Sequence, residues 1–371
     1  MRDIVVELER LLCGDERVAL ATVIRTLGST PRLPGARMVV RRGGQHLGTV
    51  GGGCGEAEVV SAGLGALATG VPRTVRVDLT EEVTEVSEAA CGGTMDVLVV
   101  PWGAELVPVA AALRDAVIAR RTLWLVTCLE PQRVLGAMVA GAEEPLAWAG
   151  VDEESAKVVY RAVKGCAGSS PSARPVEVDV DVAGERWKFF VEEVEAGPLL
   201  LICGGGHIAV PLCRMGKMLG FAVVVVDDRP SFASVERFPE ADRVICSPFE
   251  QALAGFPVDG ATYAVVVTRG HRHDLECVRK LIGRGVAYLG MIGSRRRVAG
   301  VLKLLREEGW PEEQLARLHS PIGLDIGAQT PEEIALSILA EIVQVRRGGT
   351  GRSLSLAPRL FASRGSEVGE A

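Results

Sequence analysis

The clearest pattern in the chain begins near residue 199, where short apolar runs alternate with longer segments of mixed polarity. Each run is almost continuously hydrophobic, as expected for strands that are covered on both faces. Strands that alternate with helices in this way predict an α/β domain with a doubly wound parallel sheet. The predicted strands cover residues 199–203, 221–227, 243–246, 262–268 and 286–293.

The first half of the chain has a different pattern, typical of an α+β domain. After an amphipathic first helix, a strand over 18–27 leads into the turn-rich loop 28–35. Residues 36–42 and 45–50 then predict a hairpin around Gly43-Gly44. Further expected elements are a helix over 54–68, strands over 74–79 and 95–102, a helix over 106–120, and a strand pair over 122–129 and 134–140.

Changes of pattern divide the chain into parts. Residues 165–175 are rich in Gly, Ser and Pro, which is typical of a loop or linker. Thr330, Pro331 and Glu333 predict a capped start for a C-terminal helix. The expected parts are an N-terminal domain (1–170), a linker and hairpin (171–196), the parallel-sheet domain (197–330), a C-terminal helix (331–348) and a tail without periodic pattern (349–371).

Composition narrows the class of protein. The 371 residues are 48% hydrophobic and 24% charged, and the formal net charge of -6 argues against a dedicated nucleic-acid binder. The start of the chain lacks the uncharged core of a signal peptide, and no run of about 18 apolar residues predicts a membrane span. We therefore expect a cytoplasmic protein with no nucleic-acid or membrane partner. The nine cysteines show no paired spacing, which favours reduced thiols over disulfides.

The first candidate site is the segment CGGGHIA, directly after the first parallel strand. Gly204, Gly206 and Ala209 fit the G-x-G-x-x-A pattern of Rossmann domains. The second strand ends in Asp227, about 20 positions later, as expected for a ribose-binding acid. Glycines there let a phosphate approach the helix N-terminus, with His207 touching the ligand or capping the helix. The alternative is a Rossmann-type fold with an empty or repurposed crevice.

The second candidate is TRGHRHD, residues 268–274, which follows the fourth parallel strand. Such a loop should face the same crevice as the glycine motif. His271, His273 and Asp274 have the chemistry of metal ligands, but Asp274 also fits an N-cap position. Contact with an anion or substrate, a metal site and a solvated loop therefore stay open.

The third candidate is MIGSRRR, residues 291–297. Ser294 fits an N-cap, and the three arginines from Arg295 then fall in the first helical turn, where the helix dipole disfavours cations. Arginine suits bidentate recognition of phosphate or carboxylate, so the segment predicts an anion site. A solvated basic turn is the alternative.

The fourth candidate is GTVGGGCGEAE, residues 48–58. Three glycines precede Cys54, and a cysteine at a helix N-terminus has a thiolate favoured by the dipole. Cys91, in the segment CGG, and Arg32, in GSTPRLPG, lie in other loops beside strands. Two such thiols can share a site, or the segments can simply be tight turns with small packed cysteines.

Together these segments resemble the XdhC/CoxI family, the xanthine dehydrogenase accessory proteins. The resemblance extends over residues from about 10 to 347 and includes SPIGLDIGAQTPEEIALSILAEIV near the C-terminus. It implies an N-terminal XdhC/CoxI-type domain followed by a Rossmann-like domain. One departure is Gly55, where relatives often have a larger apolar residue.

The resemblance implies a chaperone rather than an enzyme with turnover, and no catalytic residue is assigned. Such a protein would bind the molybdenum cofactor as molybdopterin while a cysteine desulfurase supplies sulfur, and deliver it to an apo molybdenum hydroxylase of the xanthine dehydrogenase type. A homodimer is expected. Cys54 and Cys91 are the candidate molybdenum ligands. The candidate cofactor-binding residues are Arg32, Gly51, Gly52, Gly53, Cys54, Glu56, Cys91, Gly92, Gly93, Gly204, Gly206, His207, Asp227, Arg229, Arg269, His271, His273, Asp274 and Arg295.

Two other functions compete with this hypothesis. An NAD(P)-dependent oxidoreductase would use the Rossmann crevice, although the sequence shows no Lys-Tyr pair or equivalent catalytic signature. Alternatively, the Rossmann domain is a binding or dimerisation module, and the first domain alone handles the cofactor.

Overall fold

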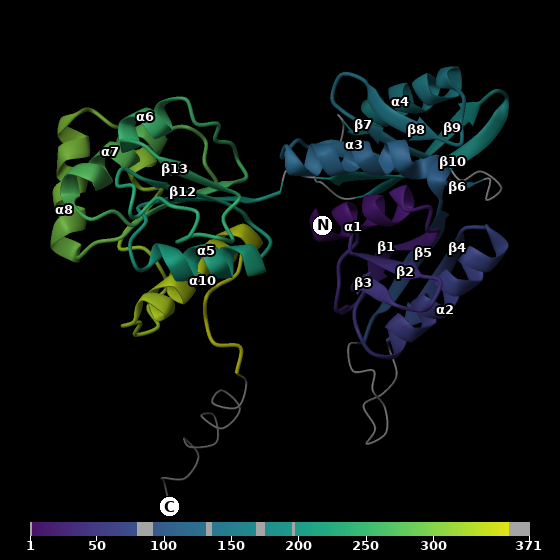
Figure 1. Cartoon of the computed structure of the whole chain (residues 1–371), viewed down its shortest axis with the longest axis horizontal. Helices are drawn as coiled ribbons and strands as arrows, with labels where there is room; N and C mark the ends of the chain where they lie inside the picture. The colour runs from purple at the N-terminus through teal and green to yellow at the C-terminus, as the bar shows by residue number, and fades with distance from the viewer. Residues whose placement is uncertain (1, 80–91, 131–135, 168–174, 195–196, 356–371) are drawn as a thin grey trace, which may run out of the picture. The chain divides into compact units, whose positions relative to one another are not determined.

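The computed structural model describes residues 2–79, 92–130, 136–167, 175–194 and 197–355. The chain divides into two compact units, Met1–Ala196 (unit 1) and Gly197–Ala371 (unit 2) (Figure 1). Unit 1 is a mixture of helices and antiparallel sheets, and unit 2 contains a parallel sheet with helices. The predicted fold class, an α+β domain followed by a Rossmann-like domain, is confirmed.

The sheet of unit 2 has six strands: β11 (Leu199–Cys203), β12 (Ala222–Asp227), β13 (Arg243–Cys246), β14 (Thr262–Val266), β15 (Tyr288–Met291) and β16 (Leu318–His319). All neighbouring strands are parallel, in the order β13-β12-β11-β14-β15-β16. This is the 3-2-1-4-5-6 order of the Rossmann fold, in which ligands bind at the carboxyl ends of the central strands.

Helices cover both faces of this sheet. The helices are α5 (Ala209–Met218), α6 (Phe249–Ala254), α7 (His271–Leu281), α8 (Arg295–Glu307), α9 (Glu312–Leu315) and α10 (Pro331–Arg347). Figure 1 shows α5 and α10 on one face and α6, α7 and α8 on the other. Successive strand residues point to opposite faces, so Leu201 packs in one core and Ile202 in the other.

Unit 1 contains two five-stranded sheets. Sheet A has the order β3-β2-β1-β5-β4, and sheet B has the order β8-β7-β6-β10-β9. The strands of sheet A are β1 (Val18–Leu27), β2 (Arg37–Arg41), β3 (His46–Gly48), β4 (Arg73–Asp78) and β5 (Thr94–Trp102). Those of sheet B are β6 (Leu123–Glu130), β7 (Ala137–Ala140), β8 (Pro145–Ala149), β9 (Val176–Val182) and β10 (Glu185–Val194).

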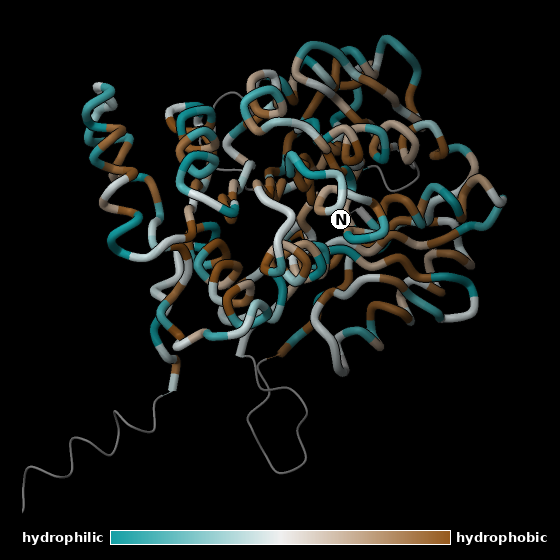
Figure 2. The backbone as a smooth tube through the Cα atoms, turned by 60° about the vertical axis from the view of Figure 1, so that its left-hand side comes forward, coloured by the Kyte–Doolittle hydropathy of each residue, from teal (hydrophilic) through white to brown (hydrophobic). Residues whose placement is uncertain are grey.

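The helices and sheets of unit 1 form successive layers. The helices are α1 (Arg2–Cys13), α2 (Cys54–Thr69), η1 (Ala104–Leu106), α3 (Val107–Ile118) and α4 (Glu153–Ala167). Helix α2 covers the outer face of sheet A, α4 covers the outer face of sheet B, and α1 and α3 lie between the sheets (Figure 1). In Figure 2, hydrophobic and hydrophilic residues alternate along the helical tubes, as expected for helices with one apolar and one polar side.

A buried ion pair joins the two sheets of unit 1. Arg37 of β2 pairs with Glu192 of β10, and both side chains are almost completely buried. Arg37 also donates a hydrogen bond to the carbonyl oxygen of Gly35 at 3.2 Å. The pair therefore fixes the end of loop 28–35 against sheet B. Removing one partner of such a pair leaves an uncompensated buried charge, which costs about 3–5 kcal/mol.

The predicted division of the chain needs correction at two places. The hairpin expected in the linker segment 171–196 is β9 and β10, and β10 pairs with β6 inside sheet B. The predicted loop from 165 overlaps α4, which ends at Ala167, and the sequence prediction included neither α4 nor β8. The C-terminal helix packs into a core of unit 2, and its predicted capping box is confirmed.

No helix within the described ranges is long and apolar enough to cross a membrane.

Candidate functional site

Three glycine-containing motifs of unit 1 meet at one end of sheet A. Gly28 follows β1, and Gly92 and Gly93 precede β5, the antiparallel neighbour of β1. A Cβ atom at Gly28 would lie 2.9 Å from the carbonyl oxygen of Gly92, and one at Gly93 would overlap the carbonyl oxygens of Ser29 and Leu27. The two loops therefore cross backbone against backbone, and only glycine fits at this crossing.

The turn before α2 belongs to the same end of the sheet. A Cβ atom at Gly51 would lie 2.7 Å from Cγ of Pro31 and 3.4 Å from Cε of Met95. By contrast, apart from their chain neighbours, no atom of the described residues lies within 4 Å of a Cβ atom built at Gly52 or Gly53. We call Gly28, Gly51, Gly52, Gly53, Gly92 and Gly93 the glycine cluster. Its Gly52-Gly53 segment is backbone with open space beside it, with φ of 81° and 65°.

Glu56 holds the turn of the glycine cluster in place. Its carboxylate accepts a hydrogen bond from the Thr49 hydroxyl and lies 3.8 Å from Nε2 of His46. Burial alone would raise the pKa of Glu56, but hydrogen bonds from Thr49 and from the amides of Gly52 and Gly51 outweigh it and lower the pKa. Sequence reasoning assigned Glu56 to the cofactor and missed Thr49. The structure gives Glu56 contacts within its own turn.

Helix α2 begins at Cys54 and packs closely on sheet A. A Cβ atom at Gly55 would lie 2.7 Å from Cγ1 of Val77 in β4, so glycine at this position lets the helix approach the sheet. The side chain of Arg32 is exposed in loop 28–35. Cys91, the second candidate thiol, lies outside the described residues. Whether Cys54 and Cys91 converge therefore stays a prediction.

In unit 2, the carboxylate of the predicted ribose-binding acid already accepts hydrogen bonds from the protein itself. Asp227 ends β12 and is only 1% exposed. Its Oδ2 accepts from the Gly205 amide at 2.8 Å and from Nη2 of Arg229 at 3.0 Å, while its Oδ1 accepts from the amide and Nε of Arg229 at 3.0 and 2.9 Å. A carboxylate has about four acceptor positions, so ribose hydroxyls find no free acceptor on Asp227.

These donors also set the ionisation of Asp227. Burial alone would raise its pKa, but the hydrogen bonds from Arg229 and from the amides of Gly205 and Arg229 outweigh burial and lower the pKa. Asp227 therefore stays ionised and locks the glycine turn to the end of β12.

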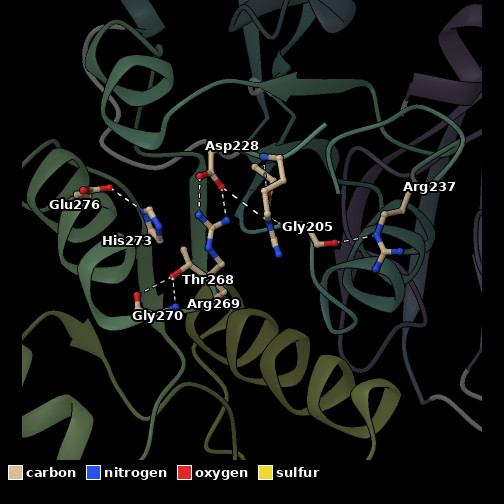
Figure 3. Close-up of polar contacts among 10 residues, drawn as sticks. Gly205, Asp228, Arg237, Thr268, Arg269, Gly270, His273 and Glu276 are labelled. Carbon is tan, nitrogen blue, oxygen red and sulfur yellow. Dashed lines mark hydrogen bonds and ion pairs between the residues drawn. The ribbon is translucent and has the colours of Figure 1, made fainter. Parts of the chain in front are cut away.

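The glycine turn of unit 2 is further closed by the segments that follow β12 and β14. A Cβ atom at Gly204 would lie 2.5 Å from the carbonyl oxygen of Val267, and one at Gly205 would overlap that of Phe232. Arg237 donates to the carbonyl oxygen of Gly205 at 2.9 Å (Figure 3). The guanidinium of Arg229 stacks on the Phe232 ring, 3.6 Å from its centroid. Sequence reasoning missed Phe232 and Arg237.

Among the remaining crevice residues, Arg269 forms an ion pair that joins the loops after β14 and β12. Arg269 and Asp228 point toward each other in Figure 3 and form two hydrogen bonds of 2.6 and 2.8 Å. This arginine lowers the pKa of Asp228. His273 contacts Glu276 at 3.1 Å (Figure 3). His207 is exposed, and the structure shows no side-chain cap on α5.

Asp274 has a structural role that differs from the predicted N-cap. Helix α7 begins at His271 with Gly270 as its N-cap, so Asp274 lies inside the helix and is completely buried. It accepts a hydrogen bond from Thr268 at 2.5 Å and pairs with Arg297 of α8. Burial raises the pKa of Asp274 despite these partners. Asp274 thus ties the first turns of α7 and α8 together.

The arginines of MIGSRRR divide between two roles. Ser294 caps α8 as predicted, accepting from the amide of Arg297 at 3.3 Å. Arg297 turns inward to Asp274, whereas Arg295 is exposed. His271, Ser294, Arg296 and Arg297 line a pocket of about 600 Å³ between α7 and α8. Within the described residues, no three His, Cys, Asp or Glu side chains form a group that could hold a metal ion, so the metal interpretation of TRGHRHD has no support.

The fold and these sites define a two-unit protein in which a Rossmann-like domain follows an α+β domain that carries the glycine cluster. A family model described as "XdhC and CoxI family" matches residues 12–78, and one described as "XdhC Rossmann domain" matches residues 200–342. The chain belongs to the XdhC and CoxI family.

Relatives of known name resemble the chain over most of its length. A protein of Bacillus subtilis (strain 168) that is named as a probable xanthine dehydrogenase subunit is 28% identical over 351 residues, which cover 92% of this chain and 96% of the relative. "Molybdenum cofactor insertion chaperone PaoD" of Escherichia coli (strain K12) is 23% identical, with 91% and 86% covered. A crystal structure described as a xanthine dehydrogenase from Bacillus halodurans is 26% identical with a TM-score of 0.74, covering 94% of this chain and 98% of that one.

Proposed function

We propose that this protein is a molybdenum cofactor chaperone. It binds the molybdopterin form of the cofactor, protects it during sulfuration and delivers it to an apo molybdenum hydroxylase of the xanthine dehydrogenase type. The family supports this function, as do the relative named a molybdenum cofactor insertion chaperone and the relatives named for xanthine dehydrogenase. The observation that carries the proposal is the glycine cluster, which brings three separate motifs together.

The glycine cluster has the chemistry that this cargo requires. Gly52 and Gly53 leave open space where other residues carry a side chain, and the positive end of α2 begins directly after them. Bare amides beside a helix N-terminus suit an anionic group such as the phosphate of molybdopterin, to which the exposed Arg32 can contribute. The cargo also carries a metal that accepts thiolates, and we assign that contact to Cys54 and Cys91.

The competing function, an NAD(P)-dependent oxidoreductase, receives less support from unit 2. The acid that would bind the ribose has its acceptor positions filled by Gly205 and Arg229. We therefore propose that the Rossmann unit does not bind a dinucleotide through Asp227. It serves instead as a binding or dimerisation module, and the chaperone is a cytoplasmic homodimer that also meets a cysteine desulfurase.

The test mixes the purified full-length protein with released molybdenum cofactor and removes the unbound fraction by gel filtration. Molybdenum and the fluorescence of the oxidised pterin should elute with the wild-type protein. Cys54→Ala should retain at least tenfold less cofactor, while Cys13→Ala, which removes an exposed cysteine of α1, should retain the wild-type amount. No co-eluting pterin with the wild-type protein would overturn the chaperone function.

A further inference from the structure

A groove lies between the two sheets of unit 1, beside loop 28–35. Its larger chamber has a volume of about 830 Å³, and an adjoining chamber has about 200 Å³. The two chambers share Ile24, Arg25 and Glu177 as lining residues, so they lie side by side. The larger chamber is within the size range of small-molecule sites, which is about 300–1,000 Å³.

Irregular strand pairing shapes this groove on both sides. The register of β1 against β5 shifts between Val23 and Arg25, so Ile24 is an extra residue in β1. The register of β6 against β10 shifts in the same way, which makes Leu129 an extra residue in β6. Both extra residues line the groove. Bulges bend strands and commonly lie next to binding sites, where they re-aim side chains.

The lining combines apolar walls with a few charged groups. Leu33 and Pro34 come from loop 28–35, whereas Val176 and Phe190 come from sheet B. Leu33 is 68% exposed, so its side chain is accessible to a ligand. Glu177 pairs with Arg25 at 2.8 Å, but the two side chains are 39% and 66% exposed, so this pair is weak and can open for a ligand.

The groove adjoins the glycine cluster through the same loop. Pro31 packs against Gly51, and Leu33, two residues further along, lines the groove. Two residues span at most about 7 Å of chain, so a ligand longer than this can contact both places.

We propose that this groove binds the pterin ring of the cofactor, with Glu177 as the residue that recognises its amino edge. The proposal rests on the proposed function and assigns a place to one part of the cargo. A pterin has two ring faces that can pack against Leu33 and Pro34, and its 2-amino group and N3–H are two neighbouring donors that match the two oxygens of a carboxylate. Leu33 and Pro34 cover the ring, and Arg25 is released to solvent or to the cargo's oxygens.

The first experiment measures cofactor retention by full-length variants. Glu177→Gln and Leu33→Asp should each weaken retention about tenfold. The matched control for Glu177 is Asp179→Asn, which changes another exposed ion pair of β9, with Arg186 at 2.8 Å. The matched control for Leu33 is Ile118→Asp at the end of α3, where the side chain is 50% exposed. Both controls should stay within twofold of wild type, and thermal melting should show that all four variants fold.

The second experiment titrates the wild-type protein and Glu177→Gln with pterin and with lumazine, in which an oxo group replaces the 2-amino group. Wild type should prefer pterin about tenfold, and Glu177→Gln should lose that preference. If wild type retains the cofactor but the groove variants retain it equally well, or if pterin and lumazine bind alike, the groove assignment is wrong and the chaperone function stands. If wild type retains no cofactor, the function itself fails.

Discussion

The molecule contains two glycine triplets, each between a strand and a helix, and two glycines of one triplet have surroundings opposite to those of two glycines of the other. In unit 2, the protein itself fills the space beside Gly204 and Gly205, and it uses the amide and carbonyl of Gly205 for internal hydrogen bonds. In unit 1, none of the residues that the structure describes fills the space beside Gly52 and Gly53. Packing therefore explains the Rossmann-type glycines of unit 2, whereas the triplet of unit 1 has backbone available for a ligand.

This difference shows why a glycine motif alone does not identify a binding site. Gly204 and Gly205 are needed because the chain from Val267 and Phe232 passes directly over them. Gly52 and Gly53 instead adopt positive φ angles. Hydrogen bonds to Glu56 and Thr49 hold their turn from one side. What distinguishes a ligand site from a packed turn is the free space beside the backbone.

The largest expected effect is a loss of stability on substitution in the glycine triplet of unit 2, residues 204–206. Gly205→Ala would place a methyl group on the carbonyl oxygen of Phe232, and we expect it to destabilise unit 2 by about 3 kcal/mol or more. Gly206→Ala is the matched control, because none of the described residues beyond its chain neighbours has an atom within 4 Å of its Cβ position. It should change stability by less than about 1 kcal/mol. Calorimetric unfolding of the two variants measures the difference, and equal stabilities would contradict the closed turn.

The next effect concerns Asp227. Asp227→Asn should destabilise unit 2 by about 2 kcal/mol at pH 7, because charge-assisted hydrogen bonds to Arg229 and Gly205 are weakened. The folded protein lowers the pKa of Asp227, so this stabilisation is present above the unfolded pKa of about 3.9 and is lost as pH falls through the folded pKa. Denaturant unfolding from pH 7 down to pH 3 should show the variant's disadvantage shrinking. A disadvantage that grows toward low pH would contradict the assigned sign.

A smaller loss of stability is expected on substitution in the glycine triplet of unit 1, residues 51–53. Gly52→Ala meets no neighbouring atom but must adopt φ of 81°, which costs about 1–2 kcal/mol. If the bare backbone binds the cofactor, retention should fall about tenfold, far more than the stability loss accounts for at a temperature where the variant is folded. Gly70→Ala, with φ of 71° at the end of α2 and open space around it, is the matched control and should retain the cofactor normally.

The smallest expected effect is that of NAD(H) on the wild-type protein. Because Asp227 has no free acceptor, calorimetric titration should show no saturable binding at about 1 mM, a concentration at which weak dinucleotide sites fill. Saturable micromolar binding would show that the contacts of Asp227 rearrange for a ligand, and it would restore the oxidoreductase hypothesis.

Much of the fold was predictable from local patterns. The continuous apolar runs predicted the parallel sheet, and the capping box of Thr330 predicted the start of α10. The hairpin at 176–194 was predicted, but its place in sheet B was not, because its partner strand β6 lies about fifty residues earlier and long-range pairing leaves no local signal.

The candidate site was less predictable for a related reason. Sequence spacing predicted that Asp227 binds a ribose. Spacing alone cannot show that the side chain of Arg229, two positions later, folds back onto the same carboxylate. It likewise could not show that Asp274 pairs with Arg297 of another helix, or that Phe232 covers Gly205. Such contacts depend on tertiary packing. The crossing of Gly28 with Gly92 could be predicted only by knowing how β1 pairs with β5.

The most direct test is amide hydrogen exchange of the full-length protein with and without released molybdenum cofactor, because one experiment reports on both triplets. We predict that the cofactor slows exchange in peptides covering residues 49–56, while peptides covering residues 203–209 are unchanged. Slower exchange confined to residues 203–209 would place the ligand in the Rossmann unit and contradict the account.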